Sequence, residues 1–294
     1  MNLPDCLFWK SCCECGSWVF LGKEKTKTYP EDYYGGPAGK FSGWAQHLRT
    51  HFHRQRARLV QKAINRINGM VYDVGCGDGL FLKEASRLGL RIGGFEPQST
   101  PRGQTEKRLG KKLDKKVFAT LKSEKASAIT CWQVIEHMDD PPSFLQACRQ
   151  RLADGGLLTI STVNLDSFQA KCFGGKWLHL DPPRHLWIGN LPRVIQLVKD
   201  AGFSIEKVRY NSLEFGPVGW VDSLFNIVDT KRDRLLACLK QGCQEPRDWL
   251  VYILSIAFAP MALFLSLLEA GLKQPATFEI YARVKKDRLR RQGG

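Results

Sequence analysis

From about residue 70 onward, short apolar runs alternate with segments whose apolar residues recur at helical spacing. The short runs predict buried strands, and the spaced pattern predicts helices that cover them. Strands that alternate with helices favour a mainly parallel sheet with helices on both faces. We therefore predict a seven-stranded α/β sheet with strands at 70–74, 90–95, 117–119, 128–134, 157–161, 203–208 and 277–284, and helices at 80–88, 142–152 and 191–201.

Outside this pattern the chain divides into further segments. Residues 1–45 mix cysteines, aromatic residues and glycines without a period, and we interpret them as a separate lead segment. Residues 46–68 read as a basic amphipathic helix that opens the core, which extends to 210. Residues 211–275 form an apolar helical insertion, and 276–294 hold the last strand and a basic tail.

The insertion contains an uncharged run, Trp249–Leu268, and about 20 such residues can span a bilayer. The strands before and after it must pair in one sheet, so the chain has to return to the side that it left. Pro260 would kink or break a helix here. A re-entrant hairpin, a helix in the membrane interface, a dimer contact or a buried cap over the site therefore fits better than a single span. Lys231, Arg232, Arg234, Lys240 and Arg247 lie nearby and could meet anionic headgroups.

Composition and charge narrow the class of protein. Hydrophobic residues make up 43% of the 294 residues and charged residues 25%, which indicates a folded domain. The net charge of +15 favours an anionic partner, whether nucleic acid, an acidic membrane or a charged substrate. Asp5 and Lys10 interrupt any early apolar run, so we expect no signal peptide, a cytoplasmic protein and reduced cysteines.

The first predicted strand ends in a glycine-rich turn, Asp73 to Gly79, and a helix follows directly. Glycines at 75, 77 and 79 let the backbone turn sharply, and the helix start presents unpaired N–H groups to an anion. Glu96 ends the second strand, where a carboxylate can accept hydrogen bonds from both hydroxyls of a ribose. A purely structural turn with a surface Glu is the simpler alternative. A dinucleotide oxidoreductase would need glycine or alanine at position 80, where Leu80 stands.

The segments VYDVGCGDGLFL, CWQVIEHMDDPPSFL, RLADGGLLTIST and GGKWLHLDPPRHLW resemble class I S-adenosylmethionine-dependent methyltransferases, in a subfamily akin to the ubiquinone-biosynthesis O-methyltransferases. The resemblance covers about residues 30 to 284 and implies a Rossmann-like fold with S-adenosyl-L-methionine as cofactor. It also departs from the family, because Lys125-Ala126-Ser127-Ala128 replaces the usual Phe-Asp pair before the fourth strand, which leaves the adenine side unassigned. The residues that would hold the cofactor are Gly75, Gly77 and Gly79 around its methionine part, Asp73 in the turn, Glu96 on the ribose and Gln133 near the sulfur.

Methyl transfer to a hydroxyl requires a positioned acceptor and a nearby base, and histidine suits that role at neutral pH. His137 follows the fourth strand, and His185 follows the fifth, on the side where open α/β sheets bind ligands. We predict both as catalytic residues, although His137 could instead tie its loop to Glu136. A metal site from Glu136, His137 and Asp181 is conceivable, but the spacing is not diagnostic and we assign no metal.

The lead segment carries Cys12 and Cys15 in a C-x-x-C pattern followed by glycine. Two such pairs make a zinc ribbon, but here Cys6, Cys12, Cys13 and Cys15 would form an irregular set. We therefore favour a degenerate remnant over bound zinc.

These observations together predict an S-adenosylmethionine-dependent enzyme that O-methylates a small lipophilic or lipid-linked acceptor, in the cytoplasm or at the inner face of the membrane. An anionic membrane surface and a homodimer are expected partners, and nucleic acid is disfavoured. The alternatives are a saccharide or nucleic-acid methyltransferase and a non-catalytic membrane adaptor. Asp140-Pro141-Pro142-Ser143 comes close to the motif of amino-methylating DNA enzymes but ends in serine.

Overall fold

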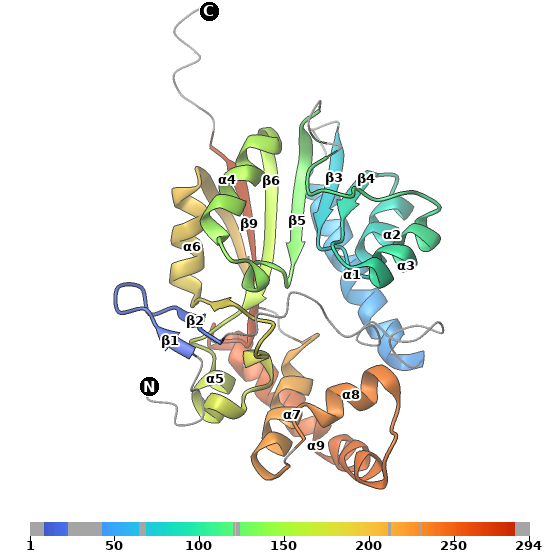
Figure 1. Ribbon diagram of the computed structural model, residues 1–294, viewed down its shortest axis with the longest axis vertical. Coiled ribbons are helices and arrows are strands. Elements are labelled where there is room, and N and C mark those ends of the chain that lie inside the picture. Colours follow the sequence, from blue (N-terminus) through green and yellow to red (C-terminus); the bar gives the residue numbers. More distant parts are fainter. Residues whose placement is uncertain are drawn as a thin grey trace, which may run out of the picture.

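The computed structural model describes residues 9–22, 43–64, 69–119, 121, 124–210, 213–229 and 231–285, and it contains a six-stranded sheet in the order β4-β3-β5-β6-β9-β8 (Figure 1). The first four of these strands run parallel, and β9 pairs antiparallel with both of its neighbours. The sheet is thus mainly parallel, as the alternation of strands and helices predicts. The strands are β3 (Met70–Val74), β4 (Arg91–Phe95), β5 (Ala126–Trp132), β6 (Leu152–Val163), β8 (Phe203–Arg209) and β9 (Thr277–Val284).

Helices cover both faces of this sheet, because successive strand residues point to opposite sides. Val71, Ala128 and Leu157 pack with α1 (Gly43–Ile64) and α2 (Leu80–Arg87). The next residues along the same strands pack with α4 (Pro141–Arg151) and α6 (Leu191–Asp200). Another helix, α3 (Ser99–Leu109), follows β4, and no periodic pattern predicted it.

The prediction of seven strands is wrong, because residues 117–119 form a turn. Phe118 has φ 61, a left-handed conformation that no strand contains. Its backbone N–H donates to Tyr72 Oη at 2.9 Å, and its ring lies 5.5 Å from the Tyr72 ring. The apolar character of this segment therefore reflects a buried aromatic anchor. A single parallel bridge between described residues, Phe95 to Asp114, adds to the sheet edge there.

Three helices form the insertion between β8 and β9, and Figure 1 shows them together at the end of the sheet to which the arrow of β5 points. They are α7 (Gly216–Val228), α8 (Arg234–Gln241) and α9 (Pro246–Gly271), and they share a small apolar core. Pro260 does not break the helix, because α9 runs through it and is 26 residues long in all; a kink at Pro260 stays a prediction. A proline inside a helix costs about 3 kcal/mol, which the packing of this long helix on α7 and α8 offsets.

Shorter elements surround the same end of the sheet. The lead segment forms a hairpin, β1 (Trp9–Ser11) and β2 (Trp18–Phe20), and β2 pairs antiparallel with β7 (Trp187–Ile188). Between β5 and β7 lie η3 (Ile135–His137), α5 (Phe168–Phe173), η4 (Gly174–Lys176) and η5 (Leu178–Leu180). The predicted basic tail after residue 285, the end of the basic helix at 65–68 and Cys6 lie outside the described residues.

Candidate active site

The glycine-rich turn has the backbone geometry that its sequence requires. Gly75, Gly77 and Gly79 all have positive φ, at 69°, 54° and 74°. A Cβ on Gly75 would lie 2.6 Å from a Val134 methyl group, and one on Gly79 would lie 2.5 Å from Thr105. Both the conformation and the space therefore exclude side chains here.

The helix that follows this turn has no acidic residue in its first turn. Gly79 caps α2, makes no side-chain capping bond, and is followed by a first turn with no acidic residue. The first N–H groups of a helix carry a partial positive charge and bind anions such as carboxylates. This start of α2 fits the carboxylate of a methionine group.

Glu96 lies beside the turn, as the spacing predicts. Its Oε2 accepts from the Gly77 N–H at 2.9 Å, and its Oε1 accepts from the Gln98 N–H at 3.0 Å. The side chain is only 3% exposed. The carboxylate is therefore fixed at the end of β4 and against the glycines, which is the position that ribose recognition requires.

Asp73 closes β3 behind the turn and is buried. Its Oδ1 accepts from Thr130 Oγ1 at 2.6 Å, which ties β3 to β5. Burial raises the pKa of Asp73 to about 8, and the nearby Glu96 carboxylate adds to this increase. Asp73 thus joins the strand that leads into the turn to β5.

The glycine-rich turn and Glu96 form the first half of the site, on the cofactor side. The structure adds residues to this half that the sequence did not predict. Thr105 of α3 donates from Oγ1 to the Gly77 carbonyl at 2.7 Å. Arg49 and Arg108 form ion pairs with Asp78 at 3.2 and 3.4 Å, and they hold the pKa of Asp78 below its usual range although burial opposes this. No local pattern signals these contacts, because the partners lie on different helices.

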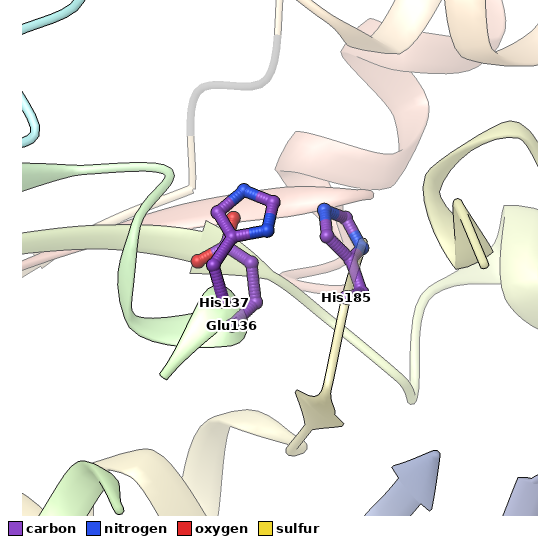
Figure 2. A group of neighbouring side chains, drawn as sticks. All are labelled: Glu136, His137 and His185. Carbon is purple, nitrogen blue, oxygen red and sulfur yellow. The ribbon is translucent and has the colours of Figure 1, made fainter. Parts of the chain in front are cut away.

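The second half of the site contains His137 and His185, whose ring centroids lie 4.8 Å apart, with Glu136 beside them (Figure 2). His137 Nδ1 lies 2.9 Å from the Arg184 carbonyl, and His185 Nδ1 lies 2.8 Å from the His179 carbonyl. A carbonyl only accepts, so each Nδ1 carries a proton and, in the neutral ring, each Nε2 carries the basic electron pair. Both predicted histidines are therefore oriented by backbone groups.

Glu136 and His185 are both deeply buried, at 0% and 7% exposure. Burial raises the pKa of Glu136, although His137 lowers it and Thr162 Oγ1 donates to its Oε2 at 2.9 Å. Burial also holds the pKa of His185 well below 6.5, and the neighbouring His137 adds to this effect. His185 is thus a neutral imidazole at pH 7.

One ligand atom from each of Glu136, His137 and His185 lies within 4.8 Å of the others, so these three could hold a metal ion. This differs from the set considered from the sequence, because His185 takes the place of Asp181. Asp181 instead pairs with Arg184. Two imidazoles and a carboxylate, with each ring fixed through its other nitrogen, match the ligand types and support of divalent transition-metal sites.

Gln133 lies between the two halves, at the end of β5. Its φ is 55°, which is unusual for a residue other than glycine, and its N–H donates to the Ser161 carbonyl at 3.0 Å. Its amide is best satisfied with the nitrogen donating to Glu136 Oε1 at 3.2 Å and the oxygen accepting from the Thr162 N–H at 3.3 Å. Gln133 therefore ties the end of β5 to β6 and to Glu136.

Arg56 of α1 was also missed as a site residue. It is 6% exposed, pairs with Glu279 at 2.9 Å and with Glu214 at 2.7 Å, and lies 4.9 Å over the Trp132 ring. The sequence shows it only as one of many basic residues in its helix, and its hydrogen-bonded partner Glu279 lies 223 positions away. Arg56, Glu214 and Glu279 thus form a cluster of charged side chains next to the end of β5.

Comparison with known proteins assigns the chain to a family. Residues 45–208, more than half of the chain, match the family described as "Methyltransferase domain". The chain therefore belongs to this methyltransferase family, and the resemblance drawn from its motifs is confirmed.

Curated relatives are named ubiquinone biosynthesis O-methyltransferase. The protein of Cereibacter sphaeroides is 29% identical over 165 residues, which cover 52% of this chain and 66% of that protein. The protein of Leptothrix cholodnii is 24% identical over 206 residues, which cover 63% of this chain and 84% of that protein. The chain thus spans somewhat less than two thirds of the first relative.

A solved S-adenosylmethionine-dependent methyltransferase from Archaeoglobus fulgidus has the same fold. It superposes with a TM-score of 0.50 at 16% identity and covers 80% of this chain and 94% of that one. The Rossmann-like fold class is therefore confirmed, with six strands in place of seven.

Proposed function

We propose that this protein uses S-adenosyl-L-methionine to O-methylate a lipophilic acceptor at a lipid surface. The observation that carries the proposal is that two groups of residues share one edge of the sheet. The glycine-rich turn with Glu96, which we call the glycine cradle, and the His137–His185 pair both follow the ends of parallel strands. Ligands of open α/β sheets bind at that edge. The names of the curated relatives support oxygen as the accepting atom.

S-adenosyl-L-methionine supplies an electrophilic methyl group when it is bound. The residues of this chain then have two tasks. Gly75, Gly77, Gly79 and the start of α2 hold the methionine part, and Glu96 holds the ribose. His137 accepts the proton of the acceptor hydroxyl at Nε2, because its Nδ1 is already committed to the Arg184 carbonyl.

A metal-assisted version of the same reaction is favoured by the buried carboxylate of Glu136 beside two imidazoles. A divalent cation held by Glu136, His137 and His185 would offset the buried negative charge and lower the pKa of a bound hydroxyl. Metal analysis of the purified protein decides between the versions. The metal-assisted version requires bound metal, loss of activity with a chelator and loss of metal in His185→Gln. A metal-free, chelator-resistant active protein leaves His137 as the base.

The lipophilic acceptor is inferred from the outward face of α9. Ile253, Ile256 and Phe264 are 59%, 61% and 61% exposed. Of the helices that the described ranges contain, α9 is the one long and apolar enough to cross a bilayer, with a mean hydropathy of 2.3, and 17% of its most apolar window is buried. A buried cap would hide this face, whereas a helix lying in a membrane interface would use it. Lys231 and Arg247, which are about half exposed, add cationic groups nearby for anionic headgroups.

The experiment for the reaction uses methyl-labelled S-adenosyl-L-methionine and a cellular lipid extract. We expect label in an extractable lipid with the natural protein and none with Gly79→Val. An unlabelled lipid fraction, together with normal binding of the cofactor product in calorimetry, would show that the acceptor is not a lipid.

The experiment for the surface is flotation with vesicles of phosphatidylglycerol and phosphatidylcholine. We expect the natural protein to float and Ile256→Glu with Phe264→Glu to remain in solution. Val117→Glu is the matched control. Val117 is also an apolar residue that is 43% exposed, but it lies in the methyltransferase domain and not in the insertion. If the natural protein ignores vesicles but the double variant changes a dimer into a monomer, the face binds a second copy.

A further inference from the structure

The segment from Gly174 to Leu186 brings His185 into the site but has little structure of its own. It contains only the single-turn elements η4 and η5. Nevertheless Trp177, Leu178 and Leu180 are at most 5% exposed. Buried backbone groups need hydrogen-bond partners, so this segment must find them elsewhere.

Three side chains of the insertion supply those partners. Ser223 Oγ accepts from the Leu178 N–H at 2.8 Å, and Asn226 Nδ2 donates to the Lys176 carbonyl at 3.1 Å. Arg232 donates to the carbonyls of Gly175 and Trp177 at 2.8 and 3.2 Å. Four consecutive residues, 175–178, are thus held by Ser223, Asn226 and Arg232, which we call the insertion clamp.

Two of the three clamp residues are fixed by burial, whereas Arg232 is exposed. Ser223 and Asn226 are at most 1% exposed. Asn226 and Asp233 exchange two hydrogen bonds, at 2.9 and 2.8 Å. Helix α7 also lies directly against the segment, because a Cβ on Gly219 would come within 2.8 Å of His179 Nε2. The insertion therefore holds the segment as a fixed surface.

The held residues lead directly to the imidazole of His185. Leu178 is followed by His179, and the His179 carbonyl accepts from His185 Nδ1 at 2.8 Å. We propose that the insertion clamp positions His185, acting through residues 175–178 and the His179 carbonyl, so that the insertion belongs to the active site as well as to the outer surface. This inference rests on the proposed role of His185.

The outward face of α9 and the clamp are different parts of the insertion. The proposed lipid contact uses exposed side chains of α9, whereas the clamp uses α7 and the loop before α8. Clamp variants should therefore still float with vesicles, because the α9 surface is unchanged in them.

The first test reads the position of His185 without any activity. The protein contains six histidines, so nitrogen-labelled histidine spectra can be assigned to His185 with His185→Gln. In the natural protein we expect the His185 Nδ1 proton, which is hydrogen-bonded to the His179 carbonyl, to exchange slowly with water at pH 7. In Arg232→Ala we expect this proton to exchange faster, because residues 175–178 then hold the His179 carbonyl less firmly.

Gln244→Ala is the matched control, because Gln244 also donates to a backbone carbonyl, that of Gln241, but within the insertion. Its spectrum should be that of the natural protein. Ser223→Ala, which removes a single acceptor, serves if Arg232→Ala fails to fold, as judged by circular dichroism. An unchanged exchange rate of the His185 Nδ1 proton in a folded clamp variant overturns the proposal, whether or not the protein proves to be a methyltransferase.

The second test is kinetic. A displacement of a catalytic group by about 1 Å costs about a hundredfold in rate, so Arg232→Ala should lower kcat by about tenfold to a hundredfold. The KM for S-adenosyl-L-methionine should stay unchanged, since the glycine cradle is not touched. A raised KM with an unchanged kcat would instead make the clamp part of cofactor binding and would overturn the proposal.

Discussion

The two halves of the candidate site are assembled over very different distances in the sequence. The cofactor half is local, because Gly77 and Glu96, which hydrogen-bond to each other, are 19 positions apart. The acceptor half spans the chain: His137 bonds to a residue 47 positions away, and the segment that carries His185 is held by residues 45 to 57 positions away. In this methyltransferase the cofactor half is therefore formed by one short stretch of sequence, whereas the acceptor half depends on contacts between distant segments.

The largest expected effect comes from a substitution that disrupts the acceptor half alone. His137→Gln should lower kcat by about a hundredfold to ten-thousandfold, because the base is lost. Binding of the cofactor product, measured by calorimetry, should stay within the error of the natural value. Weakened cofactor binding in this variant would show that the two halves are not separable.

A second substitution breaks the cofactor half alone. Gly79→Val places a branched side chain at φ 74° and against Thr105, and we expect cofactor binding to weaken by at least about a hundredfold. Gly89→Ala is the control, since Gly89 has φ 78° with open space around it. It should lower the free energy of unfolding by about 1 kcal/mol and leave cofactor binding intact.

A smaller change sharpens the comparison within the cofactor half. Glu96→Gln keeps the shape but removes the charge that accepts from Gly77 and Gln98. Loss of a charge-assisted bond corresponds to about tenfold weaker binding, measured by calorimetry with the cofactor product. An unchanged affinity would mean that Glu96 orders the turn and does not bind the ribose.

The smallest effect concerns the pH dependence of stability in the acceptor half. Burial lowers the pKa of His179 from 6.5 to about 4. The stability from its neutral form is fully present above pH 6.5 and is lost as the pH falls toward 4, because the unfolded chain binds the proton first. His179→Gln should flatten the dependence of the unfolding free energy on pH in this window by at most about 1 kcal/mol per pH unit, measured with urea. Equal slopes in both proteins would contradict the burial of His179.

The sequence predicted what is encoded locally. The glycine turn, Glu96 and the alternation of strands with helices follow from patterns within about one βαβ unit. Phe118 was misread as strand because a buried aromatic in a turn and a strand residue give the same apolar signal. His137 and His185 could be named individually, but their common contact with Glu136 depends on how two loops meet, and no spacing encodes that. The clamp was invisible for the same reason, since Ser223 and Asn226 are ordinary polar residues in an apolar segment.

The pairing of β2 with β7 has a practical consequence for anyone who shortens this protein. The family match begins at residue 45, and trimming to that boundary would discard Trp18 and Val19, which pair with Ile188 and Trp187. The trimmed protein would retain its nucleoside cradle but expose the strand directly after His185 to solvent. We expect it to bind the cofactor but to lack activity, so fragments cut at the family boundary would not test the proposed function.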